Sequence, residues 1–139
     1  CGDPSVAEVG ASFSTATTKN GWFGMPDNCA IDADGRLWVS TDGNNQKATG
    51  RTDGLWAVET EGAMRGTSKL FFRVPVGAEM CGPVFNPTGD TLFLAVQHPG
   101  YEGLATFEKP ATKWPDFADN MPVRPAVVVV TKQAGGKIA

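Results

Sequence analysis

The sequence contains two similar segments, and this internal repeat restricts the possible folds more than any other feature. Residues 28–42 read NCAIDADGRLWVSTD, and residues 82–97 read GPVFNPTGDTLFLAVQ. Each segment has an apolar run, a turn that starts with Asp or Asn and ends with Gly, and a second apolar run. This turn chemistry predicts two tight β-hairpins. Their turn glycines, Gly35 and Gly89, lie 54 residues apart.

Further apolar runs follow each hairpin after a long polar insert. We expect a third strand at 55–59 in the first unit and at 126–131 in the second, and a fourth strand at 70–74 that closes the first unit. Antiparallel four-stranded meanders that repeat at such intervals are typical of β-propeller blades. Gly 17 and Pro 10 among 139 residues argue against a helix-rich chain. The sequence therefore predicts an all-β fold with about two four-stranded antiparallel blades.

The repeat also predicts how the chain is divided. Residues 1–24 are expected to connect from a preceding blade, 25–76 to form one blade, and 77–139 to form a second with a long rim loop at 98–124. Since a propeller needs about four to eight blades, two cannot close a ring. We expect the chain to be a fragment of a larger propeller domain. Its first residue, Cys1, is then a fragment start or a processed lipoprotein N-terminus.

Composition excludes several classes of partner. The formal net charge of −3 gives no basic field for nucleic acid. No apolar run is long enough for a membrane-spanning helix. Three scattered cysteines suit neither a disulfide framework nor a zinc site. The expected partners are the remaining propeller blades, or a second copy, covering the open blade faces.

Polar residues at the start of each inner strand are the main site candidates. The predicted inner strands begin near Asp27 and Asn28 in the first unit and near Glu79 in the second, so these side chains are expected at one channel mouth. Carboxylates and an amide carbonyl are ligands that Ca²⁺ uses, and carboxylates also bind Fe³⁺. The alternative is that Asp27 and Asn28 cap a local turn. Glu79 lies between apolar and glycine residues, where a carboxylate without a partner is costly.

Two further residues are candidates for chemistry. His98 could act as a general acid or base, as a hydrogen-bond donor to a phosphate group, or as a metal ligand. Alternatively, its role could be structural. Arg51 could bind an oxyanion through its fork of N–H donors, or form a salt bridge at the rim. Cys29 and Cys81 are read as small buried apolar residues of the inner strands.

Four ordered segments of the sequence resemble one family. They are MPDN at 25–28, IDADGRLWVSTDG at 31–43, GAEMCGP at 77–83 and TLFLAVQHPG at 91–100. Together they are similar to the C-terminal part of PhoX-type alkaline phosphatases. The resemblance implies a secreted phosphomonoesterase on a six-bladed propeller, with Fe³⁺ and Ca²⁺ in the central channel. It implies a phosphate monoester as substrate and a periplasmic or extracellular location.

Carried over to this chain, the resemblance makes Glu79 the leading metal ligand. Asp27 stands where many members have a Glu, which is a longer carboxylate. The iron-binding Cys of the family is expected outside this chain, so neither Cys29 nor Cys81 receives that role. The isolated chain is expected to show little catalysis and to bind no metal tightly, because removing blades removes ligands.

Two other functions remain open from the residues alone. A propeller hydrolase of the lactonase or gluconolactonase kind would also use Glu, Asn and Asp around a Ca²⁺ ion. A propeller binding module without enzymatic activity would use the long rim loops to contact a protein partner. Activity on lactones would identify the first, and absence of tightly bound metal would favour the second.

Overall fold

Two antiparallel sheets make up the fold of the computed structural model, which describes residues 1–45 and 47–139. The first sheet has the order β1 (Pro26–Ile31), β2 (Leu37–Thr41), β3 (Gly54–Val58) and β4 (Ser68–Arg73). The second has the order β5 (Glu79–Phe85), β6 (Thr91–Gln97) and β7 (Ala126–Thr131). Two 3₁₀ turns, η1 (Ala7–Val9) and η2 (Gly62–Met64), lie in the connections. Residue 46 lies outside the described residues.

The all-β prediction is confirmed, and the second sheet differs from it in one respect. That sheet has three strands in the described part of the chain, where four were expected. After β7 the chain turns at Gly135 and Gly136, which both have positive φ, and does not extend along the sheet. The tail then returns to the β5–β6 turn, where the Ile138 amide donates to the Gly89 carbonyl at 2.8 Å. The tail therefore fills the core instead of adding a strand.

Both predicted hairpin turns form, for the chemical reason given above. The Gly35 amide donates to the Asp32 carbonyl at 3.0 Å, and the Gly89 amide donates to the Asn86 carbonyl at 3.0 Å. Both glycines have positive φ, which a residue with a Cβ rarely adopts. The Asp32 carboxylate also accepts hydrogen bonds from its own turn and from the Trp38 indole at 2.9 Å.

The hydrophobic core lies between the two sheets. Alternate residues of β6 and β5 point toward the first sheet, as the two-residue period of a strand requires. Trp38 of β2 packs edge-on against Phe85 of β5 and Phe71 of β4. The buried members of this core are Trp38, Leu55, Val74, Ala78, Met80, Leu92, Leu94, Val96 and Ile138. This packing places β5 next to β1 and β2.

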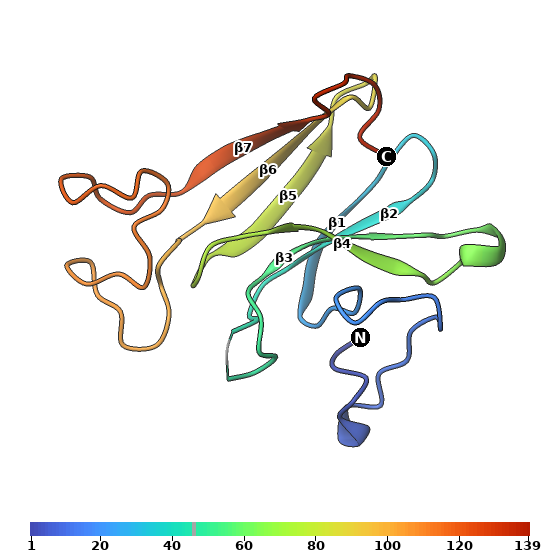
Figure 1. Cartoon of the computed structure of the whole chain (residues 1–139), viewed down its shortest axis with the longest axis horizontal. Helices are drawn as coiled ribbons and strands as arrows, with labels where there is room; N and C mark the ends of the chain where they lie inside the picture. Colours follow the sequence, from blue (N-terminus) through green and yellow to red (C-terminus); the bar gives the residue numbers. More distant parts are fainter. Residues whose placement is uncertain (46) are drawn as a thin grey trace.

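The N-terminal segment covers the other face of the first sheet (Figure 1). Trp56 points to that face because it alternates with the core residue Leu55. Its ring contacts Phe23, with 5.9 Å between ring centroids, and its indole donates to the Asn20 carbonyl at 3.2 Å. Ser68 of β4 donates to the Gly21 carbonyl at 2.7 Å. The middle strands β2 and β3 are thus largely buried on both faces, whereas β1 is largely exposed.

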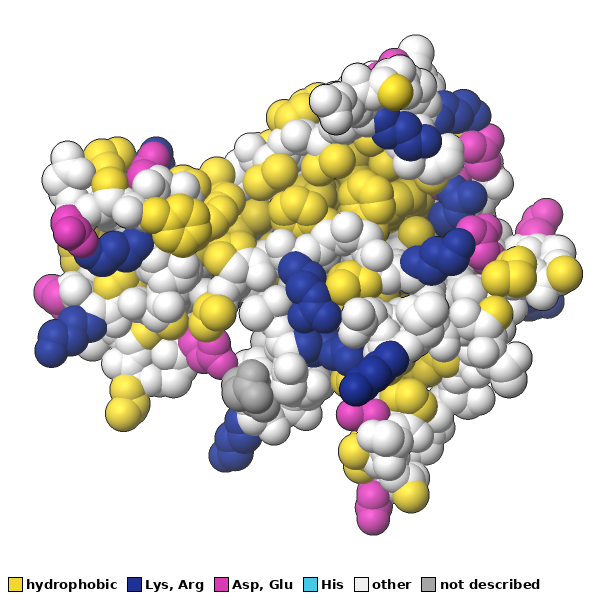
Figure 2. Space-filling view, in the orientation of Figure 1, with side chains coloured by type: hydrophobic (Ala, Val, Ile, Leu, Met, Phe, Trp, Pro, Cys, Tyr) yellow, Lys and Arg dark blue, Asp and Glu magenta, His cyan; other side chains and the backbone are white. Residues whose placement is uncertain are grey.

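The second sheet is covered on one face only. Hydrophobic side chains form a broad band across the upper part of the visible face in Figure 2. On the second sheet, Val84, Phe93, Val127 and Val129 are all exposed. Phe93 pairs with both Val84 and Val129, and Val127 lies two residues before Val129 on the same face of β7. An apolar sheet face of this kind is suited to packing against another sheet. Among the described residues, no helix has the length and hydropathy needed to cross a bilayer.

Candidate functional site

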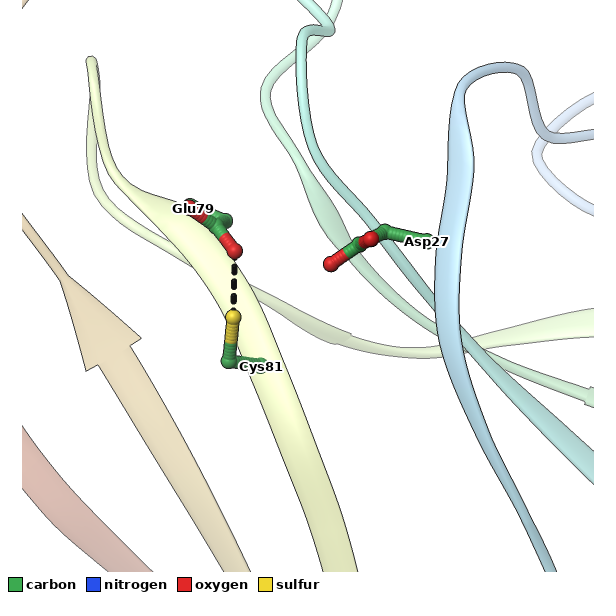
Figure 3. A group of neighbouring side chains, drawn as sticks. All are labelled: Asp27, Glu79 and Cys81. Atoms are coloured by element: carbon green, nitrogen blue, oxygen red, sulfur yellow. Dashed lines mark hydrogen bonds between the residues drawn. The ribbon is translucent and has the colours of Figure 1, made fainter.

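Two acidic side chains face each other where β1 and β5 lie side by side. One carboxylate oxygen of Asp27, one of Glu79 and the sulfur of Cys81 all lie within 4.8 Å of one another. Figure 3 shows Glu79 and Cys81 on β5, with Asp27 reaching toward them from β1. Asn28 joins the same two strands, since its Oδ1 accepts from the Gly82 amide at 3.3 Å. The structure therefore brings Asp27 and Glu79 together, and Asn28 contacts the strand that carries Glu79.

Irregular strand pairing accompanies both ligand-bearing strands. The β1–β2 register shifts between Pro26 and Cys29, and the β5–β6 register shifts between Cys81 and Val84. Gly82 sits in the second shift with a φ of +51°. Bulges of this kind redirect side chains and are common beside functional sites. Here they lie next to Asp27 and Glu79.

Three neighbouring side chains hold the Glu79 carboxylate. The Cys81 thiol donates to Oε1, the same oxygen accepts from Gln97 Nε2 at 3.2 Å, and His98 Nε2 lies 3.2 Å from Oε2. Gln97 Nε2 also donates to the Cys81 sulfur. Both Glu79 oxygens are thus fixed in position. Burial, followed by the hydrogen bond to Glu79, raises the pKa of Cys81 to about 12, so this group is a thiol.

His98 sits between two hydrogen-bond acceptors. Its Nδ1 lies 3.0 Å from the Gly77 carbonyl, and its Nε2 faces Glu79. Both bonds form only when both ring nitrogens carry a proton, because neither partner is a donor. Burial alone would lower the pKa of His98, but the bonds to Gly77 and Glu79 raise it above its ordinary value. The site therefore favours an imidazolium.

A second acidic residue, Asp42, extends the site. One oxygen of Asp42, one of Glu79 and a ring nitrogen of His98 lie within 4.8 Å of one another. Burial raises the pKa of Asp42, and the nearby carboxylates of Glu79, Asp53 and Asp27 raise it further, while His98 opposes them. Several carboxylates thus gather around one cationic side chain. This excess of negative charge favours binding of a cation.

The two long inserts meet above these residues. A cavity of about 550 Å³ is lined by the segment 42–45 after β2 and by His98 and residues 101–103 after β6. Tyr101 packs edge-on against His98, with 5.9 Å between ring centroids. Its side chain is also exposed. The cavity is therefore lined by polar side chains and by the aromatic ring of Tyr101.

Asp53 stabilises the insert that follows β2. Its buried carboxylate accepts from Thr41 Oγ1 at 2.6 Å, from the Gly43 amide at 3.0 Å, and from the Asn44 amide and side chain at 3.0 and 2.7 Å. A buried carboxylate is stable only with such a set of donors. These bonds fix the backbone that carries Asp42.

Arg51 lies away from this site. Its guanidinium stacks on the Trp22 ring at 3.5 Å from the centroid and donates to the Trp22 carbonyl at 2.9 Å. It lines a different cavity with Asp3 and Lys19, next to the N-terminal segment. The structure therefore does not bring Arg51 together with Glu79 or His98, and its guanidinium contacts Trp22 instead.

Sequence reasoning did not place two neighbours of Glu79, Asp42 and Cys81, in the site. Cys81 is two residues from Glu79 on one strand, so alternation places both on the same face. Gln97 is the direct cross-strand partner of Glu79. Asp42 follows β2 at the rim where Glu79 begins β5. Alternation along β5 was therefore a signal for Cys81, whereas the pairing of Gln97 with Glu79 depends on the β5–β6 register shift.

The donor set fits a metal ion. Ligand atoms around one ion stand roughly 3 to 5 Å apart when each bond is about 2.0 to 2.5 Å. Both clusters have their ligand atoms within 4.8 Å of one another. Carboxylate oxygens suit Ca²⁺ and iron alike, and His and Cys atoms suit a transition metal.

Comparison with known proteins gives two matches. The profile of the family described as alkaline phosphatase PhoX matches residues 1–100. The solved structure of Pseudomonas fluorescens PhoX in complex with vanadate, a transition state analogue, matches with a TM-score of 0.73 and 29% sequence identity. That match covers 90% of this chain and 20% of that chain, so the present chain spans about a fifth of the solved protein. No curated protein sequence matches the chain significantly.

Proposed function

Because the chain belongs to the alkaline phosphatase PhoX family, we propose that it forms part of an exported, metal-dependent enzyme that hydrolyses phosphate monoesters. The observation that carries this proposal is that Glu79 is shared by two clusters of possible ligand atoms, one with Asp27 and one with Asp42 and His98. The solved relative was studied with vanadate, described as a transition state analogue, which supports a phosphate-like substrate. We propose Ca²⁺ and Fe³⁺ as the metals.

Glu79 is the proposed principal ligand. It is the residue common to both clusters of ligand atoms, and its two oxygens are already oriented by neighbouring donors. Asp27 and Asp42 would hold ions on either side of it. Asn28 contributes less directly, since its Oδ1 already accepts from Gly82. When bound, the ions neutralise phosphate oxygens and stabilise the charge of the transition state.

His98 has two proposed roles in this site. It orients Glu79 through Nε2, and it places a positive charge beside the cavity. Its side chain is 47% exposed, so a phosphate group can reach it. Both ring nitrogens face protein acceptors, Gly77 and Glu79, so the proposed role toward phosphate is that of a nearby positive charge.

The exposed apolar face of the second sheet is proposed to pack against another part of the same enzyme. The chain spans only a fifth of the solved relative, and Val84, Phe93, Val127 and Val129 need a cover. Further blades of the propeller supply such a cover. A second copy of the chain is the alternative.

The test uses the full-length protein that contains this segment. It is expected to release p-nitrophenol from p-nitrophenyl phosphate, to lose this activity on chelation, and to recover it with Ca²⁺ and iron. The family match favours this outcome over the two alternatives. Lactone hydrolysis without phosphatase activity would support a lactonase-like enzyme, and full-length protein without tightly bound metal would support a binding module.

A further inference from the structure

We infer that a cavity within the β6–β7 loop binds the organic group of the phosphate ester and selects an aromatic or other apolar group there. The inference rests on the proposed function and deepens it, because it names the class of alcohol that the enzyme releases. Tyr101 is the residue to which we assign this specificity.

The loop cavity lies next to the cavity already described. The long loop that joins β6 to β7 is at the left of Figure 1. It forms a cavity of about 350 Å³, lined by residues 98–101, 105–107, 110 and 123–125. His98 and Tyr101 line this loop cavity and also the 550 Å³ cavity that Asp42 lines. The two cavities therefore adjoin at these two residues. An ester whose phosphate lies beside Glu79 and His98 can extend its organic group past the Tyr101 ring.

The loop cavity presents apolar surface to a ligand. Tyr101 is 77% exposed and Phe107 is 81% exposed, although both side chains are large and aromatic. Pro110 and Val123 add further apolar surface to the lining. Ligand cavities are lined mainly by apolar and aromatic side chains, and an aromatic ring gains most by stacking on another flat or apolar group. An exposed pair of rings beside the proposed phosphate site is therefore suited to an organic group.

The charged side chains that line the loop cavity already have protein partners. Arg124 donates to both carboxylate oxygens of Asp116, one of them at 3.1 Å. His98 faces the Gly77 carbonyl and Glu79. A second charged group on the ligand would lose its water without gaining a free partner from Arg124 or His98. This favours an apolar ester group over a polyol or a second phosphate.

Backbone contacts hold Tyr101 in position without a ligand. The Gly100 amide donates to the Val76 carbonyl at 2.8 Å, and the Tyr101 amide donates to the His98 carbonyl at 3.3 Å. A Cβ on Gly77 would lie 2.7 Å from the Tyr101 backbone, so only a glycine lets these two segments approach so closely. The Tyr101 ring is thus exposed at a fixed place, which lowers the entropy cost of binding a ligand against it.

Phe107 is held in a similar way. It lies in a turn that is closed by two hydrogen bonds between the backbones of Thr106 and Lys109, each 3.1 Å long. The Ala111 amide donates to the Gly100 carbonyl at 3.0 Å, which ties the end of this turn to the start of the loop. Backbone hydrogen bonds therefore form the loop cavity before any ligand binds.

The test compares benzyl phosphate with ethyl phosphate as substrates of the full-length protein. Their leaving alcohols have similar basicity, so the ratio of the two kcat/KM values reports contacts of the organic group. We expect the wild type to prefer benzyl phosphate. Tyr101→Ala should lower this preference about tenfold, through a higher KM for benzyl phosphate at an unchanged kcat. Tyr101→Phe keeps the ring and should keep the preference.

Two further variants locate the effect. Phe107→Ala should also lower the preference for benzyl phosphate, because Phe107 lines the loop cavity. The matched control is Phe117→Ala, since Phe117 is an exposed aromatic residue of the same loop that lines neither cavity. It should leave the preference unchanged. A folding defect would instead lower the rates with both esters.

An unchanged preference in Tyr101→Ala, or equal losses with the two esters, would overturn the inference. Binding gives a second readout that needs no turnover. Calorimetry should show that the wild type binds benzylphosphonate more tightly than ethylphosphonate, and Tyr101→Ala should remove this difference. A full-length protein that hydrolyses neither ester would reject the proposed phosphatase function. The phosphonates then decide the role of the loop cavity, and equal affinities or no binding of either would reject it.

Discussion

The Asn28 side chain accepts a hydrogen bond from the Gly82 amide at 3.3 Å, and this bond joins the inner strands of the two sheets. The two residues lie 54 positions apart in the chain. Asn28 follows Asp27, and Gly82 lies three residues after Glu79, so the bond lies near a proposed metal ligand on each strand. The spacing between the ligands therefore depends on this junction as well as on the core.

Removing the Asn28 side chain should loosen that junction. Asn28→Ala in the full-length protein is expected to lower the free energy of unfolding by about 0.5 to 1.5 kcal/mol and to weaken metal binding, since Asp27 is no longer held opposite Glu79. Thermal unfolding and metal titration measure the two effects. Asn120→Ala, at an exposed loop position, should change neither.

Asp53 should matter for stability more than for chemistry. Asp53→Ala leaves buried donors of Thr41 and Asn44 without an acceptor, and each such group costs about 1 to 3 kcal/mol. We expect a large fall in unfolding temperature and a disordered first insert. The control, Asp34→Ala, removes only an exposed ion pair with Lys137 and should have little effect. Equal losses in the two variants would contradict the role given to Asp53.

Much of the fold could be predicted, because the hairpin signals are local. The Asp32–Gly35 and Asn86–Gly89 turns fix their own backbone, and the apolar runs on either side can only be strands. The return of the tail to Gly89, which follows β7 in the described part of the chain, could not be predicted. That return is a tertiary contact with no sequence signature.

The site was harder to predict than the fold because of one bulge. Phe85 pairs with Leu92 and Val84 with Phe93, so continuing the hairpin register would place Glu79 opposite His98. The shift between Cys81 and Val84 places it opposite Gln97 instead. A one-residue slip changes every later neighbour. Glu79, Asp27 and Asn28 were found because they start the inner strands, whereas Cys81 was read as a core residue.

Asp32 should make stability depend on pH at the acidic end. Burial alone would raise its pKa, but the hydrogen bonds from Trp38 and from the Arg36 and Asp34 amides bring it below the ordinary value. A depressed folded-state pKa contributes stability above the unfolded value of about 3.9, and this is lost as pH falls through the folded pKa. Unfolding temperatures of wild type and Asp32→Asn should therefore converge at low pH. A constant gap down to the lowest pH would refute this.

His98 and Arg51 should behave differently when changed. His98→Ala removes a donor to Glu79 beside the cavity, and we expect about 10- to 100-fold lower phosphatase activity. Arg51→Ala removes the stacking on Trp22 and should lower stability while leaving the activity of the folded protein nearly unchanged. Steady-state kinetics and thermal unfolding of both variants decide this. Similar activity losses in the two would place Arg51 in the site after all.

The most direct test of the account is the change Glu79→Gln in the full-length protein, with bound metal and p-nitrophenyl phosphate hydrolysis measured on the same sample. Gln keeps the size of the side chain and removes the charge shared by both ligand clusters. We expect loss of bound metal together with loss of activity, in a protein that remains folded. Unchanged metal content and unchanged hydrolysis would contradict it.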